Sequence, residues 1–282
     1  MNQTLAMARR GRPGPAAPSG AGFADALRAE WTKLRTIPGT AWMLGAICVL
    51  TVAVSAGVTA ATKCPVGSAC AADTTKVSLT GIEVGQALVA VLAVLAISGE
   101  YSTGMIRTTF AAMPRRSVVL AAKASVLTSL VLVTASVAVA GSLAAGRLIL
   151  PGNGFTAARG FALVSLAHGP TLRAAAGSVL YLALIGLLSL AIATIVRDSA
   201  VAAGTVLGLL YVAPIITLFL GGEPTWQRWL ERYVPTNAGL AIEDTIGLRH
   251  LPIGPWGGLG VLAVWAAGAL IIGALMLRFR DA

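Results

Sequence analysis

Residues 174–196 read AAAGSVLYLALIGLLSLAIATIV, and residues 199–222 read SAVAAGTVLGLLYVAPIITLFLGG. Only Arg197 and Asp198 separate the two stretches, and neither stretch contains Asp, Glu, Lys or Arg. A helix needs about 20 mostly apolar residues to cross a hydrocarbon core about 30 Å thick. Each stretch is therefore long enough to span a membrane, and the short connection reverses the chain between them. The sequence predicts a helical membrane protein with several spans.

Three further uncharged stretches, of 27, 23 and 28 residues, reach the same length. They are residues 36–62, 124–146 and 250–277. Residues 84–99 form a stretch of only 16, which reaches spanning length only if its helix begins near Val77 and includes Glu83. We therefore predict six spans. Their approximate ranges are residues 41–62, 78–99, 120–146, 174–196, 199–221 and 256–277.

The composition agrees with a membrane protein and excludes two other classes. Of the 282 residues 56% are hydrophobic and 11% are charged, where a soluble domain has about 25% charged residues. The net charge of +10 does not indicate a disordered nucleic-acid-binding tail, because the mean hydropathy is +0.82 and disorder requires low hydrophobicity. We expect no nucleic-acid partner. Since the long stretches are apolar on every face, the predicted fold is an all-α bundle and not a β-barrel.

Charge counting predicts that both chain termini are cytoplasmic. With the N-terminus inside, 13 of the 21 Lys and Arg residues fall on the cytoplasmic side and 8 fall on the other side. Cytoplasmic loops of membrane proteins carry such an excess. Residues 1–22 predict a flexible cytoplasmic tail and not a signal peptide, because the first apolar stretch begins too late and is too long. Residues 37–282 form the predicted membrane domain.

Residues 23–36, FADALRAEWTKLRT, predict an amphipathic helix on the inner membrane surface. Phe23, Leu27, Trp31 and Leu34 recur at about one helical turn, while the charged residues face elsewhere. Those charged residues are Asp25, Arg28, Glu30, Lys33 and Arg35. The aromatic ring anchors the helix at the interface, and the basic side chains reach anionic lipid headgroups. The helix is either a simple anchor or an elbow on which a cytoplasmic partner rests.

Residues 99–123, GEYSTGMIRTTFAAMPRRSVVLAAK, form a longer cytoplasmic connection than chain reversal requires. The segment combines basic residues with apolar residues that we expect to be exposed. They are Arg107, Arg115 and Arg116, together with Met105, Ile106, Phe110 and Met113. We interpret the segment as a docking element, with a solvated loop as the alternative.

The predicted outer side carries three features of interest. Cys64 and Cys70 fall between the first two spans, where an oxidising compartment allows either a disulfide closing a short ring or two free thiols. Glu83 is the only acid within a predicted span, and it either snorkels to the interface or marks a cargo path. An aromatic stripe in residues 223–254 either anchors that interval or closes a translocation path.

The sequence contains no recognisable catalytic machinery. A phosphate-binding loop requires G-x-x-x-x-G-K-[ST], and each of the four lysines follows Thr or Ala instead of Gly. His168 and His250 lack further ligands at the spacings of a zinc site, and no G-x-S-x-G motif occurs. We therefore expect no catalytic residue, metal site or cofactor in this chain.

Two stretches carry a family resemblance. The first is EWTKLRT at residues 30–36, followed by Trp42, and the second is GEYSTGMIR at residues 99–107, followed by Arg116 and Lys123. These stretches resemble the permease subunits of type-2 ABC (ATP-binding cassette) exporters in their short, six-span bacterial form. The segment around Pro235 also resembles the outer loop of that family, and the six-span layout covers the chain from about residue 23.

The resemblance implies an assembly in the bacterial cell membrane. Two permeases, identical or sibling, would work with two cytoplasmic ABC ATPase subunits, which consume the ATP. The amphipathic segment would be a connecting helix, with Glu30, Trp31, Lys33 and Arg35 at the interface. A coupling helix after the second span would contact the ATPase. The coupling residues implied are Glu100, Tyr101, Gly104, Arg107, Arg115 and Arg116.

The expected function is export of a hydrophobic or amphipathic compound, with Glu83 as the possible lining of its path. Gly204 and Gly208 in the fifth span form a small-xxx-small pair, which suits close helix contact within or between subunits. Two other functions remain open. One is an ion-coupled secondary carrier, and the other is a membrane anchor or sensor that recruits a partner without moving cargo.

Overall fold

The computed structural model describes residues 22–65, 70, 72–112, 115–161, 164–219 and 224–279. These residues form helices and loops without a β-strand, and six of the helices are long and apolar enough to cross a membrane. The all-α class and the six predicted spans are thus confirmed for the described part of the chain. The observed spans are Pro38–Ala61, Thr74–Ser102, Arg116–Asn153, Gly169–Val196, Ser199–Ile216 and Pro255–Phe279. The predicted tail, residues 1–22, lies outside the described residues except for Gly22.

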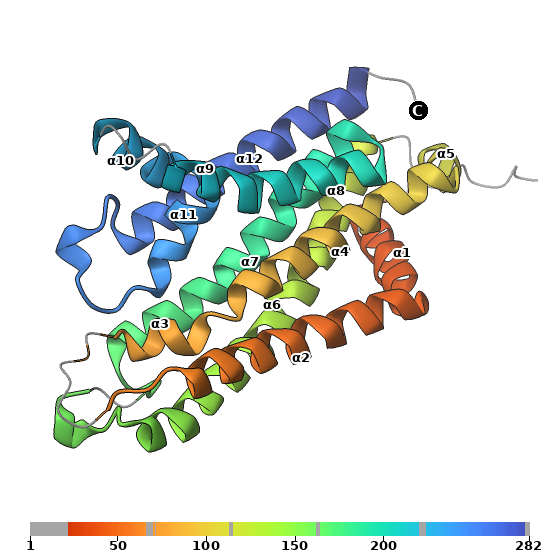
Figure 1. Ribbon diagram of the computed structural model, residues 1–282. Helices are drawn as coiled ribbons and strands as arrows, with labels where there is room; N and C mark the ends of the chain where they lie inside the picture. The colour runs from red at the N-terminus through yellow and green to blue at the C-terminus, as the bar shows by residue number, and fades with distance from the viewer. Residues whose placement is uncertain are drawn as a thin grey trace, which may run out of the picture.

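Four spans consist of one main helix each, and two are composite. The single helices are α2 (Pro38–Ala61), α6 (Arg116–Ile149), α7 (Gly169–Val196) and α12 (Pro255–Phe279). The second span joins α3 (Thr74–Leu79) to α4 (Ile82–Ser102), and the fifth joins α8 (Ser199–Leu207), the π-helical turn η3 (Gly208–Val212) and α9 (Ala213–Phe219). Figure 1 shows α7 in the middle of the bundle, where it contacts α4, α6 and α12.

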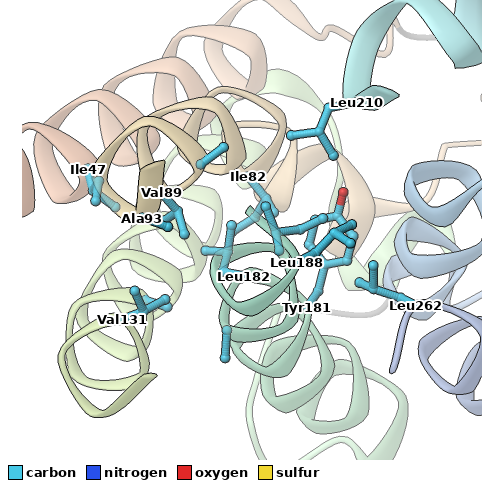
Figure 2. Close-up of a cluster of buried hydrophobic side chains, with 14 of the residues drawn as sticks. Ile47, Ile82, Val89, Ala93, Val131, Tyr181, Leu182, Leu188, Leu210 and Leu262 are labelled. Atoms are coloured by element: carbon cyan, nitrogen blue, oxygen red, sulfur yellow. The ribbon is translucent and has the colours of Figure 1, made fainter. Parts of the chain in front are cut away.

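The buried core lies around α7. Tyr181 and Leu182 of this helix are fully buried and meet side chains from the neighbouring spans, as Figure 2 shows. Val89, Val131 and Leu262 reach the same region from α4, α6 and α12. In contrast, only 22% of the residues in the apolar stretch of α2 are buried, and the same share holds for α12. Most of the apolar surface of these two helices is therefore left for lipid or a partner.

The second span begins at Thr74, earlier than the position near Val77 that the sequence predicts. Asp73 caps α3, because its Oδ1 accepts hydrogen bonds from the backbone N–H groups of Thr75 and Lys76 at 3.1 Å each. The helix then breaks at Gly81, where a Cβ atom would lie 2.0 Å from a backbone oxygen of α2. Close packing against α2 therefore requires glycine at this joint.

The fifth span also departs from a regular α-helix. In η3 the backbone N–H of Ala213 donates to the carbonyl oxygen of Gly208, five residues earlier. Pro214 follows immediately, and a proline within a helix lacks a donor and clashes with the preceding turn. The wider π turn accommodates this residue. It also places Tyr211 so that its hydroxyl group donates to the backbone carbonyl of Glu83 in α4.

The bundle has two distinct ends (Figure 1). The α1 end holds α1 (Phe23–Thr36), α5 (Met105–Ala112) and the last turns of α12. The disulfide end holds α3, α11 (Pro235–Leu240) and the loops beside them, with α10 (Pro224–Tyr233) nearby. The first and last described helices therefore begin and end at the same end of the molecule. Which end faces the cytoplasm stays a prediction.

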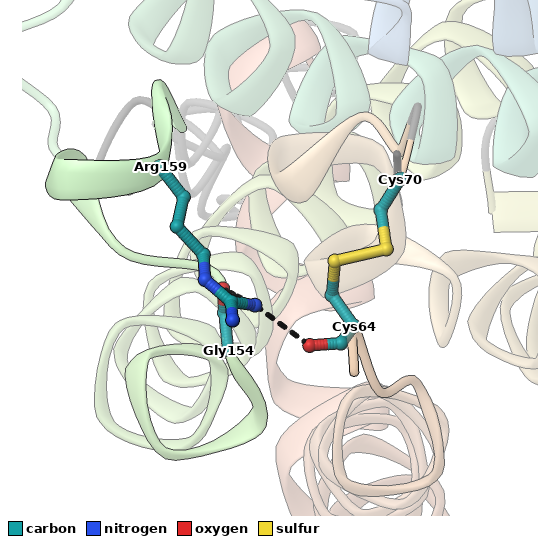
Figure 3. The surroundings of a disulfide bond; sticks show 4 residues. All are labelled: Cys64, Cys70, Gly154 and Arg159. Atoms are coloured by element: carbon teal, nitrogen blue, oxygen red, sulfur yellow. Dashed lines mark hydrogen bonds between the residues drawn. A yellow bond between two sulfur atoms is a disulfide. The ribbon is translucent and has the colours of Figure 1, made fainter. Parts of the chain in front are cut away.

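The loops at the disulfide end are tied together. Cys64 and Cys70 form a disulfide with their Cα atoms 6.0 Å apart, which is the first of the two states considered from the sequence. As Figure 3 shows, the guanidinium group of Arg159 donates to the carbonyl oxygen of Cys64 at 2.9 Å. Asp73 also accepts hydrogen bonds from the backbone N–H and hydroxyl groups of Thr245. Loops that follow three different spans are thus fastened to one another.

Candidate functional site

The helix α1 has the bounds that the sequence predicts, and it packs against the bundle through a face that shares only Leu34 with the predicted membrane-facing stripe. Its buried residues are Ala26, Glu30 and Leu34, which repeat every four positions. Phe23 and Trp31, predicted to face the membrane surface, are 46% and 48% exposed. Glu30 lies off the apolar stripe, as predicted, but its burial against the bundle was not predicted from the sequence. The face that meets the bundle carries this carboxylate because two lysines lie beside it.

Four charged side chains meet where α1 crosses α4 and α6, and we call them the charge cluster. Lys123 Nζ of α6 lies 2.6 Å from Glu30 Oε2 and 2.9 Å from Glu100 Oε1. Lys33 Nζ of α1 lies 3.0 Å from Glu30 Oε1 and 2.9 Å from the same oxygen of Glu100. Glu30, Glu100 and Lys123 are 3%, 7% and 2% exposed, so three of the four charges are withdrawn from solvent.

The cluster is neutral as a whole, which makes its burial tolerable. Withdrawing one ion from water costs several kcal/mol, and this cost is offset only when opposite charges and hydrogen bonds surround it. Lys123 satisfies this condition with the two carboxylates and a hydrogen bond of 3.1 Å to the carbonyl oxygen of Ala96. Glu100 satisfies it in part, because its Oε2 is buried without a hydrogen-bond partner among the described residues. The position of α1 is thereby fixed to α4 and α6.

The cluster also reaches α5. Lys33 Nζ lies 3.4 Å from the hydroxyl oxygen of Thr109 on that helix. Burial alone would lower the pKa of Lys33, but the hydrogen bond to Glu100 and the charge of Glu30 outweigh burial and raise the pKa above its ordinary value. Lys33 therefore stays protonated beside its two carboxylate partners. Through this one side chain the buried charges are connected to the surface of α5.

A cavity of about 290 Å³ lies between α1 and α5. Glu30 and Lys33 of the charge cluster form part of its wall, and the rest is largely apolar. The other lining residues are Ala26, Ala29, Met105, Thr108, Thr109 and Val119. A helix or loop of another protein placed here would contact both the cluster and α5.

The predicted coupling residues at the end of α4 occupy distinct positions. Glu100 belongs to the charge cluster. Tyr101 is half-buried, and the guanidinium carbon of Arg197 lies 5.5 Å from its ring centroid, as in a cation–π contact. Gly104 adopts a left-handed backbone with φ of 71°, which turns the chain between α4 and α5. This conformation disfavours any residue with a Cβ atom.

The basic residues of the segment belong to α5 and to the start of α6. Arg116 begins α6, and its guanidinium group donates to the carbonyl oxygen of Leu277 in α12 at 2.9 Å. Arg115 precedes that helix and is exposed. Arg107 belongs to α5, and its side chain lies outside the described part of the structure, as does Met113. Of these three arginines, Arg116 is therefore the one with a described contact to the bundle.

The expectation that the apolar residues of this segment are exposed holds for Met105, which is 44% exposed. It was wrong for Ile106, which is 5% exposed, because one face of α5 turns towards the bundle. The side chain of Phe110 is outside the described residues. Sequence reasoning also did not select Lys123 or Thr109 as site residues. The signal for Lys123 was its position at the edge of an uncharged stretch, where a buried ammonium group requires a carboxylate from another helix.

A second polar site lies at the disulfide end. Glu243, in the short helix η4 (Ala241–Glu243), is 4% exposed, and the hydroxyl of Ser178 donates to its Oε1 at 3.2 Å. Burial, reinforced by the nearby charge of Glu83, raises the pKa of Glu243 to about 8. Both residues line a cavity of about 270 Å³. The predicted cargo-path residue therefore has a buried acidic neighbour that the sequence did not reveal.

The raised pKa makes stability depend on pH. The unfolded carboxyl titrates near 4.3, whereas the pKa of Glu243 in the folded chain is about 8. The folded state therefore binds the proton more tightly, and stability falls as pH rises from about 5 to 8 and then levels off. We expect Glu243→Gln to remove this loss, so that its gain in Tm over wild type in detergent grows by several degrees across that range.

The matched control is Asp25→Asn, which neutralises an exposed carboxylate at the α1 end. Its Tm difference from wild type should stay constant over the same pH range. Parallel Tm curves for wild type and Glu243→Gln between pH 5 and 9 would contradict the assignment.

Among the described residues, no group of three or more His, Cys, Asp or Glu side chains is placed to hold a metal ion. A comparison with models of known protein families finds no match for this chain, and a search of curated proteins finds no significant match. The resemblance of two sequence stretches to ABC permeases therefore stays a prediction.

Proposed function

We propose that the chain is the membrane-spanning permease subunit of a type-2 ABC exporter in a bacterial cell membrane. Its role would be to couple ATP hydrolysis by a separate ATPase subunit to the outward movement of a hydrophobic or amphipathic compound. Six apolar helices supply a membrane domain of the required kind. A chain without a phosphate-binding loop motif would need a partner to supply ATP hydrolysis.

The charge cluster is the observation that carries this proposal. It joins α1 to the second and third spans, and Lys33 connects it to Thr109 on α5. Separating buried opposite charges is costly, so α1, α4 and α6 move as one unit when α5 is displaced. A subunit that receives force from an ATPase needs such a rigid connection between a surface helix and its spans. An ion-coupled carrier has no evident use for it.

The surface of the fifth span supports a dimer. A Cβ atom built on Gly204 or on Gly208 would find no heavy atom within 4 Å. Only 17% of the residues in the apolar stretch of this span are buried, and Val201, Val212 and Ile215 are more than half exposed. Small residues on an open helix face allow a second helix to approach closely in a membrane. A second copy, or a sibling permease, would fit against this face.

Crosslinking from α5 tests the proposal directly. In a Cys48→Ala background, which removes the free thiol, Met105→Cys places a thiol on an exposed position of α5. We expect a bifunctional crosslinker in native membranes to join this variant to an ATP-binding subunit, because α5 would be the docking helix. Mass spectrometry of the crosslinked product identifies the partner.

The control is Leu148→Cys, which is 81% exposed on α6 towards the disulfide end, and we expect no such product from it. If Met105→Cys yields no ATPase and none copurifies in mild detergent, the exporter proposal fails and the carrier gains support. If an ATPase is captured but its turnover never responds to cargo, the chain acts as an anchor or sensor.

A further inference from the structure

The helix α12 carries an exposed apolar stripe that ends in an arginine. Val264, Ile271 and Leu275 are 72%, 61% and 45% exposed, and Arg278 in the last turn is also exposed. Their spacing places the four side chains on one face of the helix. From Val264 to Arg278 the helix rises about 21 Å, which exceeds half of a hydrocarbon core about 30 Å thick. The stripe therefore runs from the interior of the membrane to the headgroup region at the α1 end.

Further arginines lie beside the end of this stripe, where α12 crosses the start of α6. The guanidinium group of Arg116 donates to the carbonyl oxygen of Leu277 at 2.9 Å. Arg115 comes directly before Arg116, and Arg278 comes directly after Leu277. Arg115 and Arg278 are both exposed, and neither has an ion-pair partner among the described residues. The crossing thus brings two unpaired cationic side chains to the end of the apolar stripe.

The acids that the structure describes at the α1 end are engaged elsewhere. Glu30 and Glu100 are neutralised within the charge cluster. Asp25 lies 3.9 Å from Arg28 within α1, and Asp198 caps α8 by accepting a hydrogen bond from the backbone N–H of Val201 at 2.8 Å. The positive charge at the crossing of α6 and α12 is therefore available to an external anion.

The stripe and the charge together indicate a ligand with an anionic head and a hydrocarbon chain. Arginine suits phosphate, because its planar guanidinium group donates two parallel hydrogen bonds to the phosphate oxygens. Basic side chains beside transmembrane helices attract anionic lipid headgroups. A soluble acidic protein would pair with the arginines but would not reach a stripe that extends into the hydrocarbon core. An anionic phospholipid occupies both parts of the surface at once.

We propose that the crossing of α6 and α12 binds one anionic phospholipid, whose phosphate is held by Arg115 and Arg278. One acyl chain packs along Ile271 and Leu275, which continue the same face of α12 into the membrane. Arg116 positions the site, because its hydrogen bond to Leu277 holds the two helix ends together. This inference goes beyond the proposed function, because lipid binding here requires neither an ATPase partner nor cargo.

The test is native mass spectrometry of the full-length chain, delipidated in mild detergent and titrated with one lipid at a time. The probe is dioleoylphosphatidylglycerol, and the zwitterionic control with the same acyl chains is dioleoylphosphatidylcholine. We expect the first molecule of the anionic lipid to bind about tenfold more tightly, because its headgroup carries no cation that repels the arginines. Equal affinity for the two lipids overturns the proposal.

A double variant locates the binding. Arg115→Gln combined with Arg278→Gln should weaken binding of the anionic lipid about tenfold and leave binding of the zwitterionic lipid unchanged. The matched control is Arg147→Gln combined with Arg249→Gln, which neutralises two exposed arginines at the disulfide end and should bind both lipids as wild type does. An equal loss in the two double variants assigns the preference to overall charge and overturns the proposal.

Glycerol phosphate separates a lipid site from a site for soluble phosphate, because it carries the anionic group without acyl chains. We expect it not to displace the bound lipid at about a tenfold molar excess, since it makes no contact with the apolar stripe. Displacement at equal concentration identifies a site for a soluble phosphate and overturns the proposal. The readout contains no ATPase or transport step. A failure here therefore leaves the exporter proposal untouched, and a failure of the crosslinking experiment leaves this one untouched.

Discussion

Lys123→Met is expected to lower the free energy of unfolding by about 3–5 kcal/mol, the range for breaking a buried ion pair from one side. The variant keeps the volume of the side chain but leaves the carboxylates of Glu30 and Glu100 facing each other in the protein interior. Lys33, which is partly exposed, can neutralise only one of the two. Denaturant titration of the chain in detergent micelles, followed by tryptophan fluorescence, measures the loss.

A triple variant tests whether the lost stability comes from the unpaired carboxylates. Combining Lys123→Met with Glu30→Gln and Glu100→Gln removes the unpaired charges, and we expect it to recover most of the lost stability. Lys63→Met, at an exposed position of the disulfide end, should change stability by less than about 0.5 kcal/mol. If Lys123→Met is as stable as Lys63→Met, the four charges do not form the cluster described above.

Gly258→Ala is expected to lower stability by about 3 kcal/mol, the upper part of the usual range for overpacking. A Cβ atom at this position of α12 would lie 1.9 Å from the carbonyl oxygen of Ala238 in α11. The obstacle is backbone and cannot rotate away, so α11 must move off α12. Loss of that contact also disturbs η4, which follows α11 and carries Glu243.

Gly260→Ala is the matched control for this substitution. It lies two residues further along the same helix, and a Cβ atom there would meet no heavy atom within 4 Å. Since alanine favours a helix over glycine by about 0.5–1 kcal/mol, this variant should be slightly more stable than wild type. Opposite signs for the two variants in one unfolding assay support the α11–α12 contact, and equal effects contradict it.

The spans were predictable because a membrane simplifies the requirements on sequence. An uncharged stretch of 20 or more residues has few alternatives to a spanning helix, and each such stretch here overlaps one of the observed spans. The ends were less predictable, since they depend on local partners. The second span begins early because Asp73 caps it, and the same carboxylate binds Thr245 far along the chain. No local sequence pattern predicts the contact between Asp73 and Thr245.

The site was only partly predictable from sequence. The periodicity of α1 identified a helix, but the position of Glu30 on its packing face depends on Lys123, which is 93 residues away. An amphipathic pattern normally indicates that the charged residues of a helix face solvent. The charge cluster is an exception, because its opposite charges neutralise one another in the interior. Glu243 lay in an interval with no periodic signal, so its burial against Ser178 required the structure. Cys64 and Cys70 were close enough to pair, although spacing alone left two free thiols equally open.

The π turn at Gly208–Val212 changes how the fifth span should be analysed. Each residue of an α-helix advances the helix by about 100°, and a π turn contains one residue more than an α turn. The side chains of α9 are thereby rotated out of phase with those of α8. A helical wheel drawn straight through this span would assign the residues after Pro214 to the wrong side. Interface positions chosen for mutagenesis in α9 therefore need a wheel of their own, with its origin reset at Ala213.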